Sequence, residues 1–180
     1  MSDPVCRAWS LLTLTDQVRS FFGNDGYDDR TGRSYRYDSR VANSRHVSEG
    51  DLAMIRDNRS ILGFGVISEI ELTMGNKVVR TCPSCGSSKI GKRKLKLPEY
   101  RCQLCHEECD YPKEQAVPVA LFTANYGTSW TPLNHPLSVA SVSHCYLSKA
   151  AQHAIRELSM TELLSEPSVS PLVKGLCRLS

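Results

Sequence analysis

Short stretches rich in apolar residues recur along much of the chain, and turn-forming residues separate these stretches. The clearest are 52–56 and a longer run over 61–72, joined by a polar turn at 57–60. Similar stretches cover 34–38 and 116–124. Aromatic and polar residues alternate in 34–38, and short apolar runs bounded by Gly, Asn, Asp or Ser are likewise typical of β-strands joined by tight turns. The pattern therefore predicts a fold that consists mainly of short strands.

Two glycines, Gly63 and Gly65, interrupt the longest run. Glycine inside a strand is typical of a bulge or of a bent barrel strand. Because many short strands with few helices favour a partly closed barrel, we expect an α+β fold built on a β-barrel. Such a barrel presents a pocket where its loops converge, and loops are predicted at 23–34 and 126–136.

The C-terminal part has a helical pattern. Ser148 is suited to cap a helix, and the apolar residues after it recur at three- and four-residue spacing. These residues are Ala151, Ala154, Ile155 and Leu158. Residues 160–164 continue this helix or begin another, and the tail after 167 is expected to be loosely structured. A further candidate helix lies near 16–22. The sequence thus predicts a domain at 1–147 and a helical segment at 148–180.

The composition is that of an ordinary globular protein, with 41% hydrophobic and 23% charged residues among 180. This length fits one domain with a small appendage. No apolar run reaches the roughly 18 residues that a membrane-spanning helix needs. Asp3 stands where a secretory signal carries a basic residue. We therefore expect a cytoplasmic protein without a membrane partner.

Four of the eight cysteines form two Cys-x-x-Cys pairs. Cys82 and Cys85 make the first pair, Cys102 and Cys105 make the second, and 16 residues lie between them. This spacing is typical of a four-cysteine zinc site, so we expect a zinc ribbon at 77–112. Adjacent disulfides are improbable in a reducing compartment, and a thioredoxin-like redox site would need one pair beside a βαβ pattern. Four sulfur ligands leave no open position, so the predicted Zn²⁺ is structural.

Other cysteines and one histidine offer weaker alternatives. His106 and Cys109 follow the second pair, but the symmetric spacing favours the four cysteines as ligands. Cys6, Cys145 and Cys177 have no partner at a ligand spacing and are expected to be buried apolar side chains.

Positive charge is concentrated around the cysteine pairs. The whole chain carries a formal charge of +3, yet residues 77–101 contain eight Lys or Arg and one acid, Glu99. A concentrated positive field suits a polyanion such as nucleic acid. Two alternatives are a solvated basic loop and a charge balance for the four thiolates. The candidate phosphate-binding residues are Lys89, Lys92, Arg93, Lys94 and Lys96.

No known catalytic motif for a hydrolase, a P-loop enzyme or a dinucleotide-binding enzyme occurs in the chain. His46 lies near Asn43 and Arg45, but a lone arrangement of this kind is more typical of a structural histidine. We therefore expect a binding protein without catalytic residues.

Aromatic and acidic residues gather between 24 and 43. Tyr27, Tyr35 and Tyr37 lie among several Asp and Asn residues there. An aromatic face can stack on a nucleobase for about 1–3 kcal/mol, and Asp or Asn can bind the base edge. In the alternative interpretation the tyrosines are half-buried strand residues and the aspartates form turns.

Several motifs in a fixed order carry a family resemblance over about residues 10–135. They are Gly23-Asn-Asp-Gly-Tyr-Asp-Asp29, Tyr35-Arg-Tyr-Asp-Ser-Arg-Val-Ala-Asn43, Gly50-Asp51, the two cysteine pairs, Ala124-Asn-Tyr126 and Trp130. Together they resemble the N-terminal reader domain of HNH-type, modification-dependent (type IV) restriction endonucleases of bacteria. Those readers are similar to the SRA, EVE and PUA-like group of β-barrels.

The resemblance implies binding of duplex DNA that carries a modified cytosine, such as 5-methylcytosine, in the bacterial cytoplasm at the nucleoid. The modified base is flipped out of the helix into an aromatic pocket. The implied stacking residues are Tyr35, Tyr37 and Trp130, with Tyr27 nearby, and the implied edge-reading residues are Asp38, Ser39 and Asn43. The chain has no recognisable HNH motif, so the resemblance implies a reader that stands alone or acts with a nuclease domain or subunit.

Three other functions remain open at this point. A PUA-like protein with a zinc ribbon can bind RNA. The ribbon can also serve as a protein-docking module, and a nuclease activity is a third alternative. The sequence leaves the kind of base modification, the flanking sequence preference and the oligomeric state open.

Overall fold

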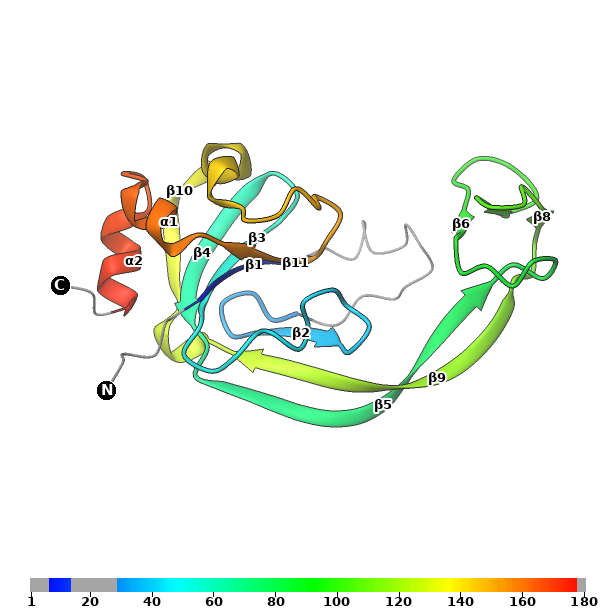
Figure 1. The fold of residues 1–180 in the computed structure, drawn as a ribbon, viewed down its shortest axis with the longest axis horizontal. Helices are drawn as coiled ribbons and strands as arrows, with labels where there is room; N and C mark the ends of the chain where they lie inside the picture. The colour runs from blue at the N-terminus through cyan, green and yellow to red at the C-terminus, as the bar shows by residue number, and fades with distance from the viewer. Residues whose placement is uncertain (1–6, 14–28, 178–180) are drawn as a thin grey trace. The chain divides into compact units, whose positions relative to one another are not determined.

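The computed structural model describes residues 7–13 and 29–177 and divides into two compact units. Among the described residues, one unit comprises 7–13, 29–73 and 120–177, and we call it the body. The other comprises 74–119, and we call it the ribbon unit. Strands β5 (Glu69–Thr81) and β9 (Lys113–Asn125) contribute residues to both (Figure 1).

A five-stranded mixed sheet forms the centre of the body, in the order β10-β4-β3-β1-β11. Its strands are β1 (Ala8–Leu12), β3 (Leu52–Arg56), β4 (Ser60–Val66), β10 (Thr131–Ser138) and β11 (Ile155–Leu158). Strands β1 and β3 are parallel, and the other neighbours are antiparallel. Both faces of β3 are buried, which explains its unbroken apolar run at 52–55.

A second sheet, in the order β2-β9-β5, covers one face of the large sheet; β2 spans Ser34–Asp38. Between the two sheets, Trp9 and Ile55 belong to one hydrophobic cluster with Tyr35, Tyr37 and Tyr126. Burial of these large side chains on both sheets holds the two sheets together.

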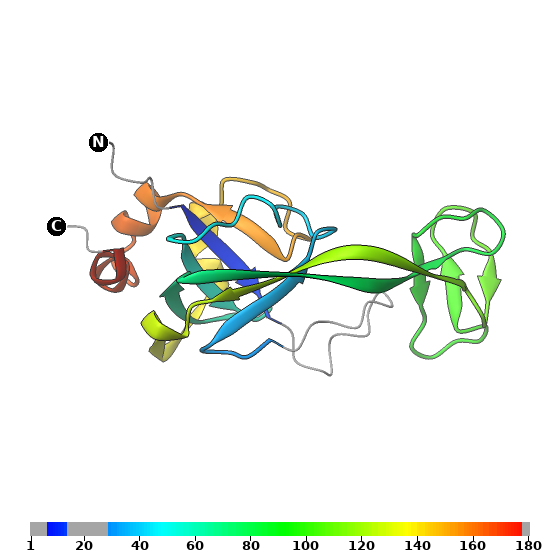
Figure 2. The same cartoon turned by 90° about the horizontal axis from the view of Figure 1, so that it is seen from below.

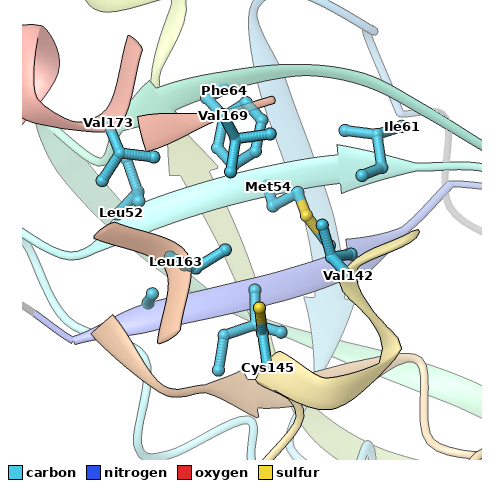
Figure 3. Close-up of a cluster of buried hydrophobic side chains, with 11 residues drawn as sticks. Leu52, Met54, Ile61, Phe64, Val142, Cys145, Leu163, Val169 and Val173 are labelled. Atoms are coloured by element: carbon cyan, nitrogen blue, oxygen red, sulfur yellow. The ribbon is translucent and has the colours of Figure 1, made fainter. Parts of the chain in front are cut away.

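Short helices cover the opposite face of the large sheet. They are η3 (Val139–Cys145), α1 (Met160–Ser165) and α2 (Ser170–Cys177). Figure 3 shows Val142, Leu163 and Val173 beside Leu52 and Met54 of β3, and all five are buried in one cluster. The body therefore has three layers: a small sheet, a large sheet and helices (Figure 1).

One glycine allows a close approach between β4 and β10. A 3₁₀ turn, η2 (Gly127–Ser129), precedes Trp130 and β10. A Cβ atom at Gly63 would lie 2.6 Å from both the Thr131 carbonyl oxygen and the Trp130 ring, so a larger residue would displace β10. The ladder between β3 and β4 shifts register beside Gly63. The bulge predicted in this run is confirmed.

The ribbon unit contains a small antiparallel sheet, in the order β6-β7-β8, which Figure 2 shows as three short strands side by side. These strands are β6 (Ile90–Lys92), β7 (Tyr100–Cys102) and β8 (Glu108–Cys109). Its hydrophobic cluster is small, with Cys82, Ile90 and Cys102 buried and Tyr100 and Cys109 packed against them.

The α+β class is confirmed, as are strands at 34–38, 52–56 and 116–124. The predicted barrel is not confirmed, because the described strands form separate sheets and no closed barrel. The predicted run over 61–72 is divided between β4 and β5. The predicted loop at 126–136 contains β10, whose two prolines are tolerated because β10 is an edge strand.

The C-terminal predictions were wrong in two places. The helix expected from Ser148 to Leu158 is replaced by a turn and by strand β11, which pairs with β1. The tail expected to be loosely structured forms α2. A helix does begin at Met160, with the Ser159 hydroxyl as its cap. The candidate helix near 16–22 lies outside the described residues. Within the described ranges, no helix has the length and apolar character needed to cross a membrane.

Candidate metal centre and nucleic-acid interface

The four predicted metal ligands come together in the ribbon unit, and all four sulfur atoms lie within 4.8 Å of one another. The Sγ atoms of Cys82 and Cys105 are 3.5 Å apart, and those of Cys85 and Cys102 are 3.6 Å apart. A disulfide requires about 2.05 Å, whereas sulfurs bound at about 2.3 Å to a tetrahedral ion lie about 3.8 Å apart. The cluster therefore fits a four-coordinate metal ion.

Both cysteine pairs lie on turns of the same design. The residue after each pair, Gly86 and His106, has a left-handed backbone with φ of 70° and 63°. Glycine adopts this conformation freely, and histidine adopts it at a small cost. The backbone amide of Cys105, followed by that of Leu104, lowers the pKa of the Cys102 thiol to about 6. These amides favour the thiolate of Cys102, whereas the neighbouring thiols and burial raise the pKa values of Cys85 and Cys105.

The two alternative ligands, Cys109 and His106, are not among the residues whose ligand atoms converge. Burial raises the pKa of the Cys109 thiol, and the neighbouring charge of Cys82 raises it further, so Cys109 stays neutral. Cys145 is buried in the body, as predicted, and Cys177 is partly buried. Cys6 lies outside the described residues.

Arg93 is part of the ribbon's internal structure. Its guanidinium donates to both carboxylate oxygens of Glu108, at 2.6 and 3.0 Å, and its Nε donates to the Pro98 carbonyl at 2.9 Å. Its backbone amide donates to the Glu99 carbonyl at 2.6 Å. These bonds close the base of the loop 94–97. The prediction that Arg93 binds phosphate therefore needs correction, because four of its five guanidinium N–H groups already have partners within the ribbon unit.

The other candidate phosphate ligands differ in how they are engaged. Lys92 pairs with Glu99 at 3.1 Å, where both side chains are about half-exposed. Lys94 is exposed on the loop that follows Arg93. Lys89 and Lys96 are exposed and pair with no carboxylate among the described residues. Lys89 and Lys96 are therefore the lysines best placed to accept an external anion.

A hollow of about 420 Å³ lies on the ribbon unit next to the metal centre. Its lining comprises Gly91, Lys92, Arg93, Arg101, Cys102, Gln103 and His106. Three of these residues are basic, two more can form hydrogen bonds through an amide or an imidazole, and none is acidic. Such a lining is suited to an anionic ligand, although each of its three cations faces a carboxylate that weakens the field. Lys92 pairs with Glu99 at 3.1 Å, and Glu108 lies 2.6 Å from Arg93 and 3.8 Å from Arg101.

The body does not present the predicted pocket tyrosines to solvent. Tyr35 is 4% exposed and Tyr37 is 1% exposed, and both belong to the cluster between the two sheets. Tyr37 is stacked between Tyr35, at 5.7 Å, and Phe122, at 5.1 Å, measured between ring centroids. A nucleobase could stack on Tyr37 only by displacing a core side chain. The prediction of an open cup lined by these two rings is corrected accordingly.

The remaining pocket candidates have structural partners. Asp38 is fully buried, and its carboxylate accepts from the Arg40 amide at 2.7 Å. Ser39 bonds to the backbone of Ala120, and the Asn43 side chain donates to the Ile155 carbonyl at 2.9 Å. Trp130 is partly buried against the same cluster as the tyrosines. Tyr27 lies outside the described residues.

The structure also brings together three arginines that the sequence analysis did not single out. Arg30, Arg33 and Arg36 line a groove of about 500 Å³ on the outer face of the small sheet. Within the described part of the chain their guanidinium groups make no ion pair. Glu69 and Glu71 line the same groove. The signal was an arginine at every third position, which strand β2 and the turn before it place on one surface.

No protein-family model, curated protein or solved structure matches the chain.

Proposed function

We propose that the chain binds duplex DNA through the ribbon unit, with a structural Zn²⁺ in the four-cysteine cluster. The observation that carries this proposal is the hollow beside that cluster, where the lining residues that the structure describes include three cations and no carboxylate. The neighbouring Glu99 and Glu108 reduce but do not reverse this charge. Phosphate groups are the anions most often bound by clustered Lys and Arg, and backbone phosphates supply most of the affinity of nucleic-acid-binding proteins.

Zinc is the ion that fits the cluster best. Four thiolates in a tetrahedral arrangement are typical of Zn²⁺ or of iron–sulfur chemistry, and two cysteine pairs on short turns are typical of a zinc ribbon. Cys82, Cys85, Cys102 and Cys105 would occupy all four positions. An ion held in this way has no open position for substrate, so its role is to fold the ribbon.

The family resemblance of the sequence is the reason for proposing duplex DNA with a modified cytosine as the ligand. The body does not supply the aromatic pocket that the resemblance implies, because Tyr35 and Tyr37 are core residues. In this proposal they hold the two sheets together, and a flipped base is received by other groups. The reader stands alone or acts with a nuclease partner.

The test is a binding comparison across otherwise identical fluorescent duplexes that carry cytosine, 5-methylcytosine, 5-hydroxymethylcytosine or a modified adenine. A structured RNA is added as a competitor. Tighter binding of one modified duplex supports the reader function. Equal binding of all duplexes would show DNA binding without recognition of a modified base. Stronger competition by the RNA than by unlabelled duplex would show that the chain is an RNA-binding protein. Absence of binding to every nucleic acid at low salt overturns the proposal and favours a protein-docking role.

The contribution of the lysines is tested with Lys89→Ala/Lys96→Ala. Each lost phosphate contact should lower the slope of log affinity against log salt by about 0.9. The matched control is Lys149→Ala/Lys174→Ala, which removes the same charge from exposed positions of the body. An equal loss in both variants would show that total charge alone is responsible.

A further inference from the structure

The loop between β6 and β7 exposes two leucines almost completely. Leu95 is 96% exposed and Leu97 is 82% exposed, whereas leucines of the body such as Leu11 and Leu52 are fully buried. Exposed apolar side chains of this size are costly to hydrate, and two of them on one four-residue loop are typical of a contact surface. We call residues 94–97, with the sequence Lys-Leu-Lys-Leu, the ribbon tip.

The ribbon tip is fixed at its base. Arg93 precedes it, and its guanidinium bonds to the carbonyl of Pro98 on the far side and to the carboxylate of Glu108 on β8. The amide of Arg93 donates to the carbonyl of Glu99, and the side chains of Lys92 and Glu99 pair at 3.1 Å. These contacts join the two ends of the loop, so only four residues are left to form the tip. A tip held in this way loses little conformational freedom on binding.

Charge identifies the class of partner. Lys94 and Lys96 alternate with the two leucines, and Lys92 and Arg93 of the hollow lie directly before them in the chain. No acidic residue occurs between 86 and 98. A surface on which apolar side chains alternate with cations matches a ligand whose apolar faces lie beside rows of anions. Stacked bases between sugar-phosphate strands have this arrangement.

We propose that Leu95 and Leu97 pack against the base stack of duplex DNA at a groove, as an apolar wedge, while Lys94 and Lys96 contact the flanking phosphates. This inference rests on the proposed DNA binding and adds the contact that the leucines make. Leucine side chains of minor-groove-binding proteins act in this way and partly unstack a base step. An anionic membrane surface also attracts lysines and leucines, and the experiment separates it from DNA.

The test compares Leu95→Ser/Leu97→Ser with the unchanged chain on a duplex containing 2-aminopurine, whose fluorescence rises when the base is unstacked. The matched control is Leu104→Ser, because Leu104 is 63% exposed on the second cysteine turn of the same unit. The double variant should lose roughly 10-fold to 100-fold in affinity. It should also lose the fluorescence rise and keep the salt slope, since its lysines are intact. The control should bind like the unchanged chain.

The outcomes separate the inference from the function on which it rests. If the unchanged chain binds DNA and the double variant binds equally well with the same fluorescence rise, the wedge is wrong and DNA binding stands. If the unchanged chain binds phosphatidylserine vesicles but no duplex, both are wrong. One equivalent of bound zinc in each variant, measured with a chelating dye, shows that the ribbon is folded. A loss of zinc in the double variant would assign the leucines to folding and overturn the wedge.

Discussion

The body and the ribbon unit are stabilised by different interactions. The body buries two hydrophobic clusters, one on each face of its large sheet. The ribbon unit buries three residues in its cluster, two of which are metal-ligand cysteines. Its surface adds ion pairs such as Arg93–Glu108. Hydrophobic burial therefore determines the fold of the body, whereas the ribbon unit has little hydrophobic core and gathers its four cysteines at the metal centre that we propose.

The largest expected difference follows from removal of the metal. Zinc binding contributes roughly 10 kcal/mol or more to small zinc domains, and the ribbon unit has little core to replace it. We expect a chelator, or Cys102→Ser, to unfold the ribbon unit and leave the body folded. Both tryptophans, Trp9 and Trp130, belong to the body, so their fluorescence should be unchanged while the NMR signals of the ribbon unit collapse.

Cys109→Ser is the matched control, because Cys109 lies in the ribbon cluster without being a ligand. It should retain zinc and a folded ribbon. A body that melts together with the ribbon on chelation would show that the two units are not independent in stability.

The second prediction concerns Tyr37 in the body. Tyr37→Ala should destabilise the body by about 3–5 kcal/mol, as expected when a large aromatic core residue is truncated. The Tyr37 hydroxyl is buried and has no hydrogen-bond partner among the described residues, so Tyr37→Phe should be neutral or should stabilise the body by up to about 1 kcal/mol. Urea denaturation followed by tryptophan fluorescence measures both. If Tyr37→Ala kept full stability but lost preference for a modified duplex, Tyr37 would return to the binding pocket.

The same contrast explains what the sequence could predict. The sequence could predict the four-cysteine cluster because each Cys-x-x-Cys pair forms its turn from neighbouring residues. Only one long-range contact, between the two pairs, is then needed to bring the four sulfur atoms together. The prediction of a helix over Ala151 to Leu158 was wrong because the spacing of the apolar residues there is also compatible with a strand. Pairing of Leu158 with Ala8 and of Ile155 with Leu11 decides the outcome, and it depends on residues more than 140 positions away.

The tyrosines failed for a related reason. Alternation in β2 correctly places Tyr35 and Tyr37 on one face and Arg36 on the other. Packing against distant residues such as Trp9 decides which face of β2 is turned toward the large sheet. The local sequence pattern does not indicate this packing. Arg93 was mistaken for a free cation because its partner, Glu108, lies 15 residues away and is brought near by the ribbon sheet.

The third prediction weakens the ribbon without removing its metal. Glu108→Gln removes the charge that faces Arg93, whose side chain is 18% exposed. Because the pair is partly buried and bidentate, we expect a loss of about 1 kcal/mol in ribbon stability with zinc still bound. Hydrogen exchange of amides in 93–99 should speed up several-fold. Glu114→Gln, which faces the more exposed Arg80, is the control and should change exchange in 93–99 little.

The smallest expected effect concerns the arginine groove of the body. Arg30, Arg33 and Arg36 make no ion pair within the described chain, but Glu69 and Glu71 share their groove and reduce its positive potential. Glu69→Gln should therefore raise DNA affinity about two- to threefold at low salt, with the increase vanishing at high salt because the interaction is between exposed charges. Anisotropy titrations at two salt concentrations measure it. Glu162→Gln, an exposed acid on α1, gives the same change in net charge and should have a smaller effect. If both substitutions raise affinity equally, the groove acts only through the net charge of the body, and phosphate contact is confined to the ribbon unit.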